Sequence, residues 1–297
     1  MSDILQFWKI KFLPGPNRGR YPYCHSLVVE DEVTSVIDPA SDERALNEIH
    51  KDRGIDMVIV SHYHEDHWMY MKNFRGAQLW MHEADSPLMH DLDLFMEWYG
   101  MTDPKEITFM KEVLRKEFSY EERVPDRMFN DGAILEIGST RIEVVHTPGH
   151  TPGHCCFYFP EETILFLADI DLTKIGPWYG DKYSDIDTFI RSVEKVRKTP
   201  AKVHIAAHED GVIEGDPGDM WDKYLRVIDV REEKLREFIK EPRSIEEIVE
   251  ARIVFGKARE PKIFYDFGER ATMLKHLERM MGHGKAELVG DKCRLMK

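Results

Sequence analysis

The stretch SHYHEDHW, residues 61–68, is the part of the sequence that says most about the fold. It follows the apolar run Met57–Val60, which is typical of a buried strand. The side chains in it that can bind a metal are His62, His64, Glu65, Asp66 and His67. Imidazole nitrogens and carboxylate oxygens are suitable ligands for zinc, iron or manganese. So dense a cluster directly after a buried strand predicts a metal site rather than a polar surface turn.

A second histidine-rich stretch is VHTPGHTPGHCC, residues 145–156, in which His146, His150 and His154 are spaced four residues apart. On a helix this spacing would put the three rings on one face. The Pro-Gly pairs between them exclude a helix interior, because proline removes a backbone donor and glycine weakens the helix. The stretch is therefore predicted to be a repeated Thr-Pro-Gly-His turn between two strands.

Short apolar runs recur along the chain and, with helical patterns between some of them, predict a layered α/β fold. Many runs are continuous rather than alternating, which is typical of strands buried on both faces. The expected strands are Ile4–Phe12, Ser26–Val29, Val33–Ile37, Met57–Val60, Gln78–Met81, Arg141–Val145, Cys155–Phe159, Thr163–Ala168 and Val203–Ala207. The expected helices are Asp42–Arg53, capped by Ser41, Asp185–Lys198 and Pro217–Lys240.

Two parts of the chain break this order. Residues 83–130 are rich in Met, Phe, Trp and Tyr and are expected to form a helical insertion. A second unit is predicted after Glu241-Pro242, which divides the chain into residues 1–240 and residues 241–297. In this unit Ser244 and Glu247 form a predicted capping box at the start of a helix, and an amphipathic helix and a short hairpin follow.

The motif His62-Tyr-His64-Glu-Asp66-His67 resembles the H-x-H-x-D-H motif of the metallo-β-lactamase superfamily. The other family motifs follow in order, as TPGHTPGH, LFLAD (residues 165–169) and IAAH (residues 205–208). The resemblance covers residues 1–240 and implies the four-layer αβ/βα metallo-β-lactamase sandwich. The C-terminal unit resembles the small winged-helix domain that follows this fold in the branch that includes glyoxalase II-like hydrolases.

The resemblance also implies a dinuclear centre with two divalent metal ions. Zinc is the expected metal, and iron and manganese are the alternatives. The implied ligands are His62, His64 and His150 for one ion, Asp66, His67 and His208 for the other, and Asp169 as a bridge between them. Asp66 and Asp169 are the predicted catalytic residues, and Asp38 is expected to support a ligand histidine.

Other residues near these motifs have weaker signals. His204 is expected to pack in the core, His82 to lie at a strand end, and His146 and His154 to have structural roles beside His150. His25 is a candidate for supporting the site, and Glu65 is expected to be a spacer that points away. The departures from common family patterns, which leave the substrate class open, are Trp68, Ala168 and Glu209.

The composition narrows the choice of partners. The formal net charge is −14, which disfavours nucleic acid as a partner because phosphate contacts need clustered Lys and Arg. Residues 241–297 carry 12 Lys+Arg against 10 Asp+Glu, so the excess of acid lies in the rest of the chain. No apolar run is long enough for a membrane span, and no secretion signal or C-x-x-C pair is recognised, so a cytoplasmic protein is expected.

The expected activity is metal-dependent hydrolysis of a small-molecule ester or thioester by a metal-bridging hydroxide. Two loops, residues 13–25 and 171–183, carry basic and aromatic side chains and are expected to meet a substrate with an apolar part and an anionic end. The enzymatic alternatives are an endoribonuclease or phosphodiesterase and a mononuclear iron enzyme of the persulfide dioxygenase type. A non-catalytic binding module is a further alternative, and a homodimer is left open.

Overall fold

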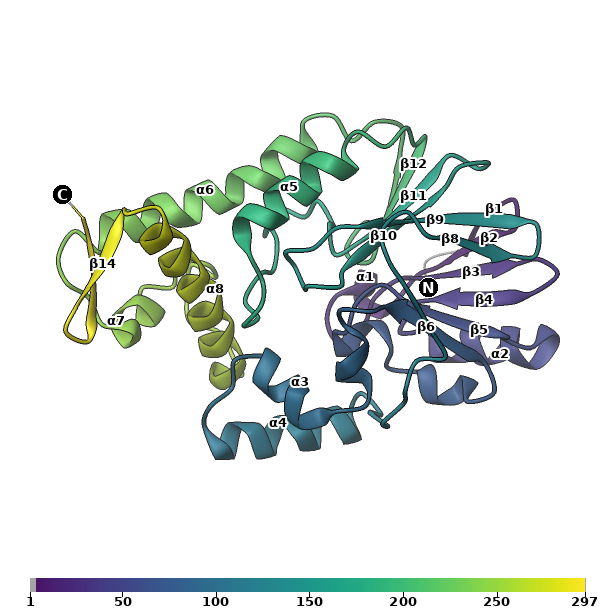
Figure 1. The fold of residues 1–297 in the computed structure, drawn as a ribbon, viewed down its shortest axis with the longest axis horizontal. Coiled ribbons are helices and arrows are strands. Elements are labelled where there is room, and N and C mark those ends of the chain that lie inside the picture. The colour runs from purple at the N-terminus through teal and green to yellow at the C-terminus, as the bar shows by residue number, and fades with distance from the viewer. Residues whose placement is uncertain (1–3, 297) are drawn as a thin grey trace.

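Two β-sheets face each other in the computed structural model, which describes residues 4–296 (Figure 1). The first sheet has the order β1 (Leu5–Phe7), β2 (Ile10–Leu13), β3 (Ser26–Glu30), β4 (Thr34–Ile37), β5 (Met57–Val60), β6 (Gln78–His82) and β7 (Arg127–Phe129). The second has the order β13 (Val212–Glu214), β12 (Val203–Ala206), β11 (Ile164–Ala168), β10 (Cys155–Phe159), β9 (Thr140–His146) and β8 (Ile134–Ile137).

The helix α2 lies on the outer face of the first sheet and α5 and α6 lie on the outer face of the second, which gives the predicted four layers (Figure 1). The helices are α1 (Pro16–Gly19), α2 (Glu43–Arg53), α3 (Leu92–Trp98), α4 (Pro104–Lys116), α5 (Ile186–Val196), α6 (Met220–Phe238), α7 (Ile245–Glu250) and α8 (Lys262–Gly282). Short 3₁₀ turns are η1 (Glu65–His67), η2 (Met71–Phe74) and η3 (Ser86–Met89). Within residues 4–296, no helix combines the length and the apolar character that crossing a bilayer requires.

The continuous apolar runs are strands buried on both faces, as predicted. In β11, Phe166 belongs to the core between the sheets, whereas Leu165 and Leu167 belong to a second core on the outer side. This second core includes Phe189 of α5 and Trp221 of α6. Successive side chains of a strand point to opposite faces, so a strand with apolar residues at every position can join two cores.

The crossovers bring particular strand ends together. β4 and β5 pair in parallel across α2, and β11 and β12 pair in parallel across α5. Parallel strands place their carboxyl ends at the same edge of a sheet. The ends of β5, β11 and β12 therefore meet at one edge of the sandwich, where the predicted metal-binding residues follow them.

Several details differ from the sequence-based expectations. The predicted strand Ile4–Phe12 is two strands, because the chain turns at Trp8, where φ is 57°. The helix α2 is capped by Asp42 rather than Ser41, since the Asp42 carboxylate accepts from the backbone N–H of Ala45 at 2.9 Å. Three short strands were not predicted: β7, β8 and β13.

The predicted helical insertion contains η3, α3 and α4, but it ends in β7, which adds an edge strand to the first sheet. An extended segment this short, with exposed Arg127 and Met128, lacks the apolar pattern that identifies the central strands.

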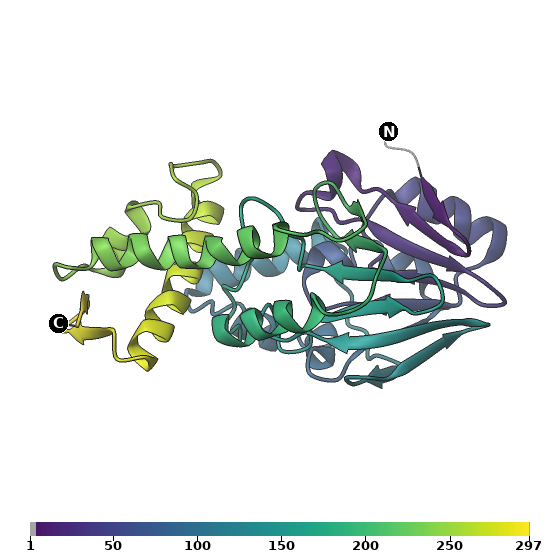
Figure 2. The same ribbon diagram turned by 90° about the horizontal axis from the view of Figure 1, so that it is seen from above.

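The C-terminal residues form α7, α8 and a hairpin of β14 (Ala286–Val289) and β15 (Lys292–Leu295). The capping box of Ser244 and Glu247 is confirmed by both of its hydrogen bonds. Figure 2 shows that α6 extends from the sandwich to these elements, and its end contributes Leu235 to their separate apolar core. The division at residue 241 and the winged-helix character of this unit stay predictions.

Candidate metal centre

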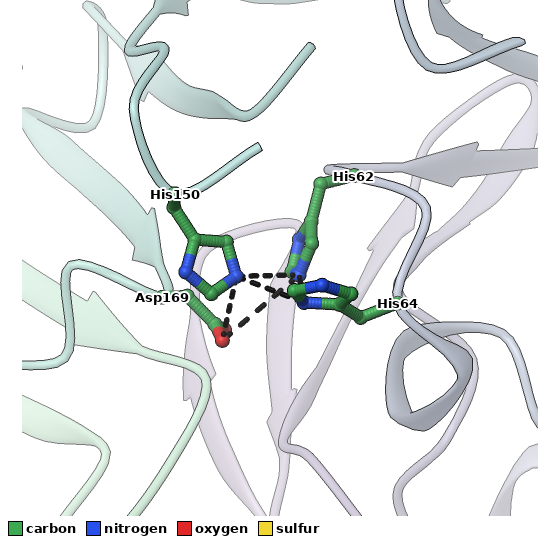
Figure 3. Close-up of side chains that lie close together, drawn as sticks. All are labelled: His62, His64, His150 and Asp169. Carbon is green, nitrogen blue, oxygen red and sulfur yellow. Dashed lines mark hydrogen bonds and ion pairs between the residues drawn. The ribbon is translucent and has the colours of Figure 1, made fainter. Parts of the chain in front are cut away.

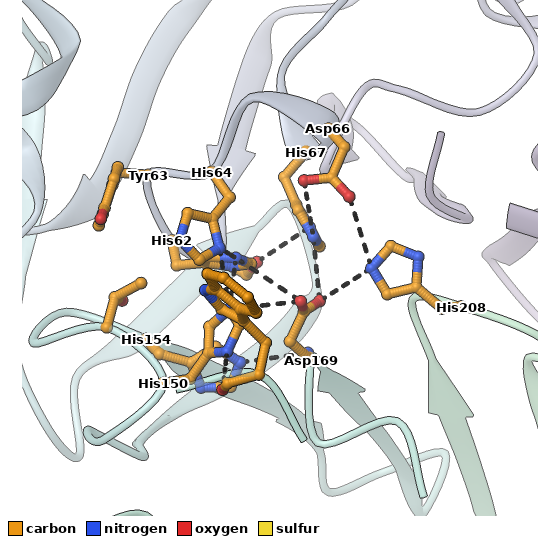
Figure 4. A network of polar contacts seen from close by, with 12 residues as sticks. His62, Tyr63, His64, Asp66, His67, His150, His154, Asp169 and His208 are labelled. Carbon is orange, nitrogen blue, oxygen red and sulfur yellow. Dashed lines mark hydrogen bonds and ion pairs between the residues drawn. The ribbon is translucent and has the colours of Figure 1, made fainter. Parts of the chain in front are cut away.

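The seven residues expected to bind metals lie together at the edge where β5, β11 and β12 end (Figure 4). His62 and His64 follow β5, and η1 then carries Asp66 and His67. The remaining three residues come from the second sheet: His150 from the β9–β10 loop, Asp169 from the end of β11 and His208 from the end of β12. Both sheets thus contribute side chains to the same site.

Three ring nitrogens meet in the first group, which consists of His62, His64, His150 and Asp169 (Figure 3). His62 Nε2 lies 3.0 Å from His64 Nδ1, and His150 Nε2 lies 3.1 Å and 3.0 Å from these two atoms. Burial holds the pKa of His62 well below its ordinary value and lowers the pKa of His150 to about 4. Both rings are therefore neutral at pH 7. Against burial, which lowers it, Asp181 raises the pKa of His64 to about 9 and Asp169 raises the pKa of His208 to about 10, so these two rings would release a proton on binding a metal.

The second group consists of Asp66, His67 and His208, and Asp169 lies between the two groups (Figure 4). Asp169 Oδ1 is 3.0 Å from His67 Nε2 and 3.2 Å from His208 Nε2. Its other oxygen, Oδ2, is 3.3 Å from His150 Nε2. One carboxylate therefore offers one oxygen to each group.

The outer nitrogen of each ring, which points away from the groups, faces an oxygen atom. The pairs are His62 Nδ1 with Ser61 Oγ (2.9 Å), His64 Nε2 with Asp181 Oδ2 (2.7 Å), His67 Nδ1 with Asp38 Oδ2 (2.9 Å), His150 Nδ1 with the carbonyl of Trp178 (2.9 Å), and His208 Nδ1 with the carbonyl of Gly19. Carboxylates and carbonyls only accept, so the outer nitrogens of His64, His67, His150 and His208 carry a proton, and the Ser61 hydroxyl can accept a hydrogen bond from His62 in the same way. The nitrogen that faces the group then presents a lone pair.

These lone pairs fit two divalent cations. The three ring nitrogens of the first group lie about 3 Å from one another, and a bound cation would accept the lone pair of each once His64 has released its proton. Beside the second group, His67 Nε2 and Asp169 Oδ1 face each other at 3.0 Å, are buried and make no hydrogen bond of good geometry. Buried polar atoms are rarely left unpaired, and a bound ion would satisfy these atoms. Histidine and carboxylate donors suit zinc, iron or manganese.

Asp38 contacts the site as predicted. Its Oδ2 accepts from His67, and its Oδ1 accepts from the backbone N–H of Ser61 at 2.8 Å. Asp38 has a φ of 52°, in the left-handed region that non-glycine residues rarely adopt. The end of β4 is therefore shaped to aim one carboxylate at both the start and the end of the 61–68 stretch.

The three histidines of the Thr-Pro-Gly-His turn have different partners. His150 alone belongs to a metal-binding group. His146 Nε2 donates to the carbonyl of Pro152 at 2.8 Å, and its ring stacks on His82 at 4.1 Å between centroids. His154 Nε2 accepts from the backbone N–H of Asp169 at 3.2 Å, so it holds the backbone of the residue that joins the two groups.

Two further histidines were considered in the sequence. His204 is buried in β12 and its Nδ1 donates to the carbonyl of Gly215 at 3.0 Å, which is a structural role. His25 accepts from the backbone N–H of Gly15 at 2.9 Å and donates to the carbonyl of Glu209 at 3.1 Å. It therefore links the 13–25 loop to Glu209, the residue after His208.

Glu65, expected to be a spacer, lies outside both metal-binding groups but is buried. Its carboxylate accepts from the hydroxyl of Tyr21 at 2.9 Å and from the hydroxyl of Tyr99. The ring of Tyr99 also stacks on His64, with 5.8 Å between centroids. Glu65 thus joins the N-terminal loop and the helical insertion to the turn η1.

The family departures at Ala168 and Glu209 occupy special backbone positions. Ala168 has a φ of 47° and Glu209 a φ of 61°, in the left-handed region that glycine adopts without strain. Glu209 also pairs with Arg20 at 2.7 Å, and Arg18 pairs with Glu209 and Asp210. The basic residues of the 13–25 loop are therefore neutralised by acids that follow His208.

Two buried aspartates were missed by the sequence reasoning. Asp85 accepts from the backbone N–H groups of Tyr63 (3.1 Å) and Gly153 (2.6 Å) and from Thr151 Oγ1 (2.7 Å), so it joins the two histidine-bearing loops. Asp181 accepts from His64, as described above. Neither lies next to a predicted metal ligand in the sequence. In addition, no local sequence pattern indicates that an aspartate in a loop is buried.

The chain is similar in sequence to a family of known proteins. The family model of the metallo-beta-lactamase superfamily matches residues 22–208. Hydroxyacylglutathione hydrolase GloC of Haemophilus influenzae is 31% identical over 153 residues, which cover 49% of this chain and 65% of that protein. Acyl-coenzyme A thioesterase MBLAC2 of Gallus gallus is 25% identical over 144 residues, which cover 47% of this chain and 50% of that protein. The chain thus spans less than two thirds of the length of these relatives.

Solved structures extend the likeness to nearly the whole chain. A metallo-beta-lactamase family protein of Thermus thermophilus superposes with a TM-score of 0.71 at 20% identity, over 97% of this chain and 99% of the other. A beta-lactamase domain protein of Burkholderia ambifaria superposes with a TM-score of 0.69 at 17% identity, over 99% and 94% of the two chains. At such identities the likeness shows the fold alone. Together with the match over residues 22–208, it shows that the chain belongs to the metallo-beta-lactamase superfamily.

Proposed function

We propose that this chain is a dinuclear metallohydrolase, with zinc as the expected metal, that cleaves the thioester bond of a small molecule. The observation that carries the proposal is the position of Asp169, whose two oxygens face different groups of histidines. A carboxylate in this position can bridge two ions. The proposed ligands are the seven residues of the two groups, His62, His64, Asp66, His67, His150, Asp169 and His208.

The bridging role requires that Asp169 be held firmly. Its backbone N–H donates to His154 Nε2 at 3.2 Å, and its backbone carbonyl accepts from the hydroxyl of Tyr224 at 3.0 Å. Both partners are buried. A backbone fixed on both sides leaves the carboxylate little freedom, and such preorganisation is what catalytic constellations need.

The proposed chemistry is hydrolysis of a thioester by water: the water oxygen, as hydroxide, forms a bond to the carbonyl carbon, the C–S bond breaks, and the thiolate leaves and takes up the proton that the water has lost. Divalent ions held by the seven residues would supply hydroxide at neutral pH and positive charge for the carbonyl oxygen. The chain itself supplies the imidazoles and the carboxylates of Asp66 and Asp169, whose negative charge would balance the charge of the ions. Cys155 and Cys156 are buried and burial raises the pKa of both thiols, so neither is suited to act as a nucleophile.

A thioester is the favoured substrate because relatives named hydroxyacylglutathione hydrolase and acyl-coenzyme A thioesterase match about half of this chain in sequence. Aromatic rings gather on the side of His64, where Phe267 of α8 contacts both Tyr99 (6.2 Å between centroids) and Trp178 (6.3 Å). These rings suit an apolar acyl part. The arginines of the 13–25 loop are already paired, so they give less support to an anionic end than the sequence suggested.

The proposal can be tested with the purified chain and a panel of a hydroxyacylglutathione, an acyl-coenzyme A, a lactone, a phosphodiester and RNA. We expect thioester hydrolysis to be the fastest reaction, to stop on chelation and to return with zinc. Elemental analysis should give about two ions per chain. RNA cleavage with inert thioesters would instead favour an endonuclease. One tightly bound iron with oxygen consumption on a persulfide would favour a dioxygenase, and either result would overturn the proposal.

A further inference from the structure

One loop, residues 171–183, contacts two of the three histidines in the first group. The carbonyl of Trp178 accepts from His150 Nδ1 at 2.9 Å, and the carboxylate of Asp181 accepts from His64 Nε2 at 2.7 Å. Each contact places a proton on the outer nitrogen and turns the other nitrogen toward the group. A short segment of chain therefore orients both rings.

Asp181 is built into this position. Its side chain is 1% exposed, and it accepts from Tyr63 at 2.6 Å and from the indole N–H of Trp178 at 3.1 Å, in addition to His64. Among residues 4–296, His64 is its only ion-pair partner. A buried carboxylate without a lysine or arginine partner is costly, so its contact with His64 is a specific feature rather than general ion pairing.

The loop is supported from behind by α6. The Arg231 guanidinium donates to the carbonyls of Ile175 and Pro177 at 2.8 Å each, and to the hydroxyl of Tyr179 at 2.9 Å. Arg231 is buried. It thus holds the first half of the loop at three oxygens, and Trp178 lies between two of these points.

The second half of the loop is supported by α8, which belongs to the C-terminal part of the chain. Lys275 Nζ donates to the carbonyl of Lys182, the residue after Asp181, at 2.6 Å. His276 Nε2 contacts the hydroxyl of Tyr179 at 2.9 Å. Both side chains are buried. The position of Asp181 therefore depends on a helix that contributes no residue to either metal-binding group.

We propose that Asp181 is a positioning residue for the metal ion bound by His62, His64 and His150. We propose further that α8 sets the affinity of the chain for that ion, because it holds the loop that carries Asp181. This inference rests on the proposed function, because it takes the three histidines as metal ligands. It adds a role for the C-terminal residues that does not involve contact with substrate or nucleic acid.

The main test is Asp181→Asn, in which an amide of the same shape replaces the carboxylate. Removal of such outer contacts costs roughly 10- to 100-fold in metal affinity. In competition with a chelator, we expect the variant to lose one of its two zinc ions at about 10- to 100-fold lower chelator concentration and to retain the other as the wild type does. Excess zinc should restore thioesterase activity to Asp181→Asn but not to His64→Ala. Unchanged zinc retention in Asp181→Asn would overturn the proposal.

The role of α8 has its own matched pair of variants. Lys275→Met removes the hydrogen bond to the loop, whereas Glu278→Gln removes only the exposed ion-pair partner of Lys275 on the same helix. We expect Lys275→Met, and not Glu278→Gln, to lower the affinity of the chain for one of the two zinc ions several-fold. If Asp181→Asn does not fold, this pair decides, and equal zinc retention in both variants overturns the proposal.

The two proposals fail in different ways. A wild-type chain that binds no pair of ions, or hydrolyses no thioester, would overturn the proposed function. A wild-type chain that binds two ions and hydrolyses thioesters, with Asp181→Asn indistinguishable from it, would overturn the positioning role alone.

Discussion

The two halves of the candidate metal centre differ in exposure. In the three-histidine group, the side chains of His62, His64 and His150 are 0%, 7% and 1% exposed. In the other group, Asp66, His67 and His208 are 9%, 0% and 12% exposed, and the shared Asp169 is 14% exposed. The second half is therefore the more open half, through Asp66 and His208, although His67 within it is fully buried.

The two halves also differ in what holds them. His64 and His150 are oriented by a loop that rests on α6 and α8. His67 is oriented by Asp38 at the end of β4, and His208 by the carbonyl of Gly19 in the N-terminal loop. The comparison teaches that each proposed metal depends on a different part of the chain. It follows that substitutions should release the two ions separately.

The largest effect is expected where the two halves meet. Asp169→Ala should lower thioesterase activity by on the order of 10³-fold and release both ions, because each oxygen of Asp169 serves one group. Activity and zinc content should be measured together. Asp219→Asn, an exposed aspartate at the start of α6, serves as the control and should change neither. Retention of two tightly bound ions by Asp169→Ala would refute the bridge.

Single substitutions in each half should separate the two ions. His150→Ala and His208→Ala should each lose one ion and lower activity by on the order of 10²-fold. Chelator titrations should show a different ion missing in each variant. His146→Ala, in the same turn as His150, should retain both ions because the ring of His146 faces Pro152 and His82 and belongs to neither histidine group. Loss of metal from His146→Ala instead of His150→Ala would overturn the assignment.

A smaller effect is expected from His25, which supports the half that contains His208. It concerns the free energy of unfolding. Burial lowers the pKa of His25 to about 4, below its ordinary value of 6.5. The unfolded chain therefore binds more protons between these pKa values, and stability is lost as the pH falls from 6.5 toward 4. From pH 7 to pH 5 this histidine should cost about 2 kcal/mol of unfolding free energy.

Denaturant unfolding of the metal-free protein at several pH values checks this expectation. His25→Asn keeps an acceptor for Gly15 but cannot take up the proton, so its acid sensitivity should be smaller than that of the wild type by this amount. His90→Asn, at an exposed histidine, is the matched control. If the unfolding free energies of the wild type and of His25→Asn fall equally between pH 7 and pH 5, then His25 is not a source of the acid sensitivity.

The smallest effect is expected from the strained residues beside each half. Ala168→Gly removes the strain of a left-handed φ, which is about 1 kcal/mol. It also removes a buried methyl group and raises the conformational entropy of the unfolded chain, and both of these lower the unfolding free energy. The net change in unfolding free energy should be within about 1 kcal/mol. Glu209→Gly should behave similarly in the other half. Unchanged zinc content in both variants would show that the turns, not their side chains, aim Asp169 and His208.

The sequence was informative where chemistry is concentrated. The 61–68 stretch combines an apolar strand with clustered histidine and carboxylate side chains, so the strand end and the meeting of these side chains could be predicted, and metal binding stays a prediction. The same holds for Asp169 and His208, each of which follows a continuous apolar run. The short edge strands β7, β8 and β13 lack such runs, and their pairing is decided by the neighbouring strands.

The supporting residues could not be found in this way. Asp181 and Asp85 act on histidines that are distant in the chain, so their partners appear only when the loops are folded. The choice between Ser41 and Asp42 as helix cap depends on where the backbone becomes helical, which differs by one residue. Propensity favours both residues equally at this position.

The placement of His62 and Asp169 in different sheets has a consequence for the supply of folded protein. A metal bound by residues of both sheets binds the folded chain and not the unfolded one, so folding and metal uptake are linked equilibria. At a free metal concentration 1,000 times the dissociation constant, this linkage adds about 4 kcal/mol to the unfolding free energy. The amount of folded protein in a cell would therefore depend on the concentration of free metal. At low metal concentration a larger fraction of the chains would unfold and be degraded.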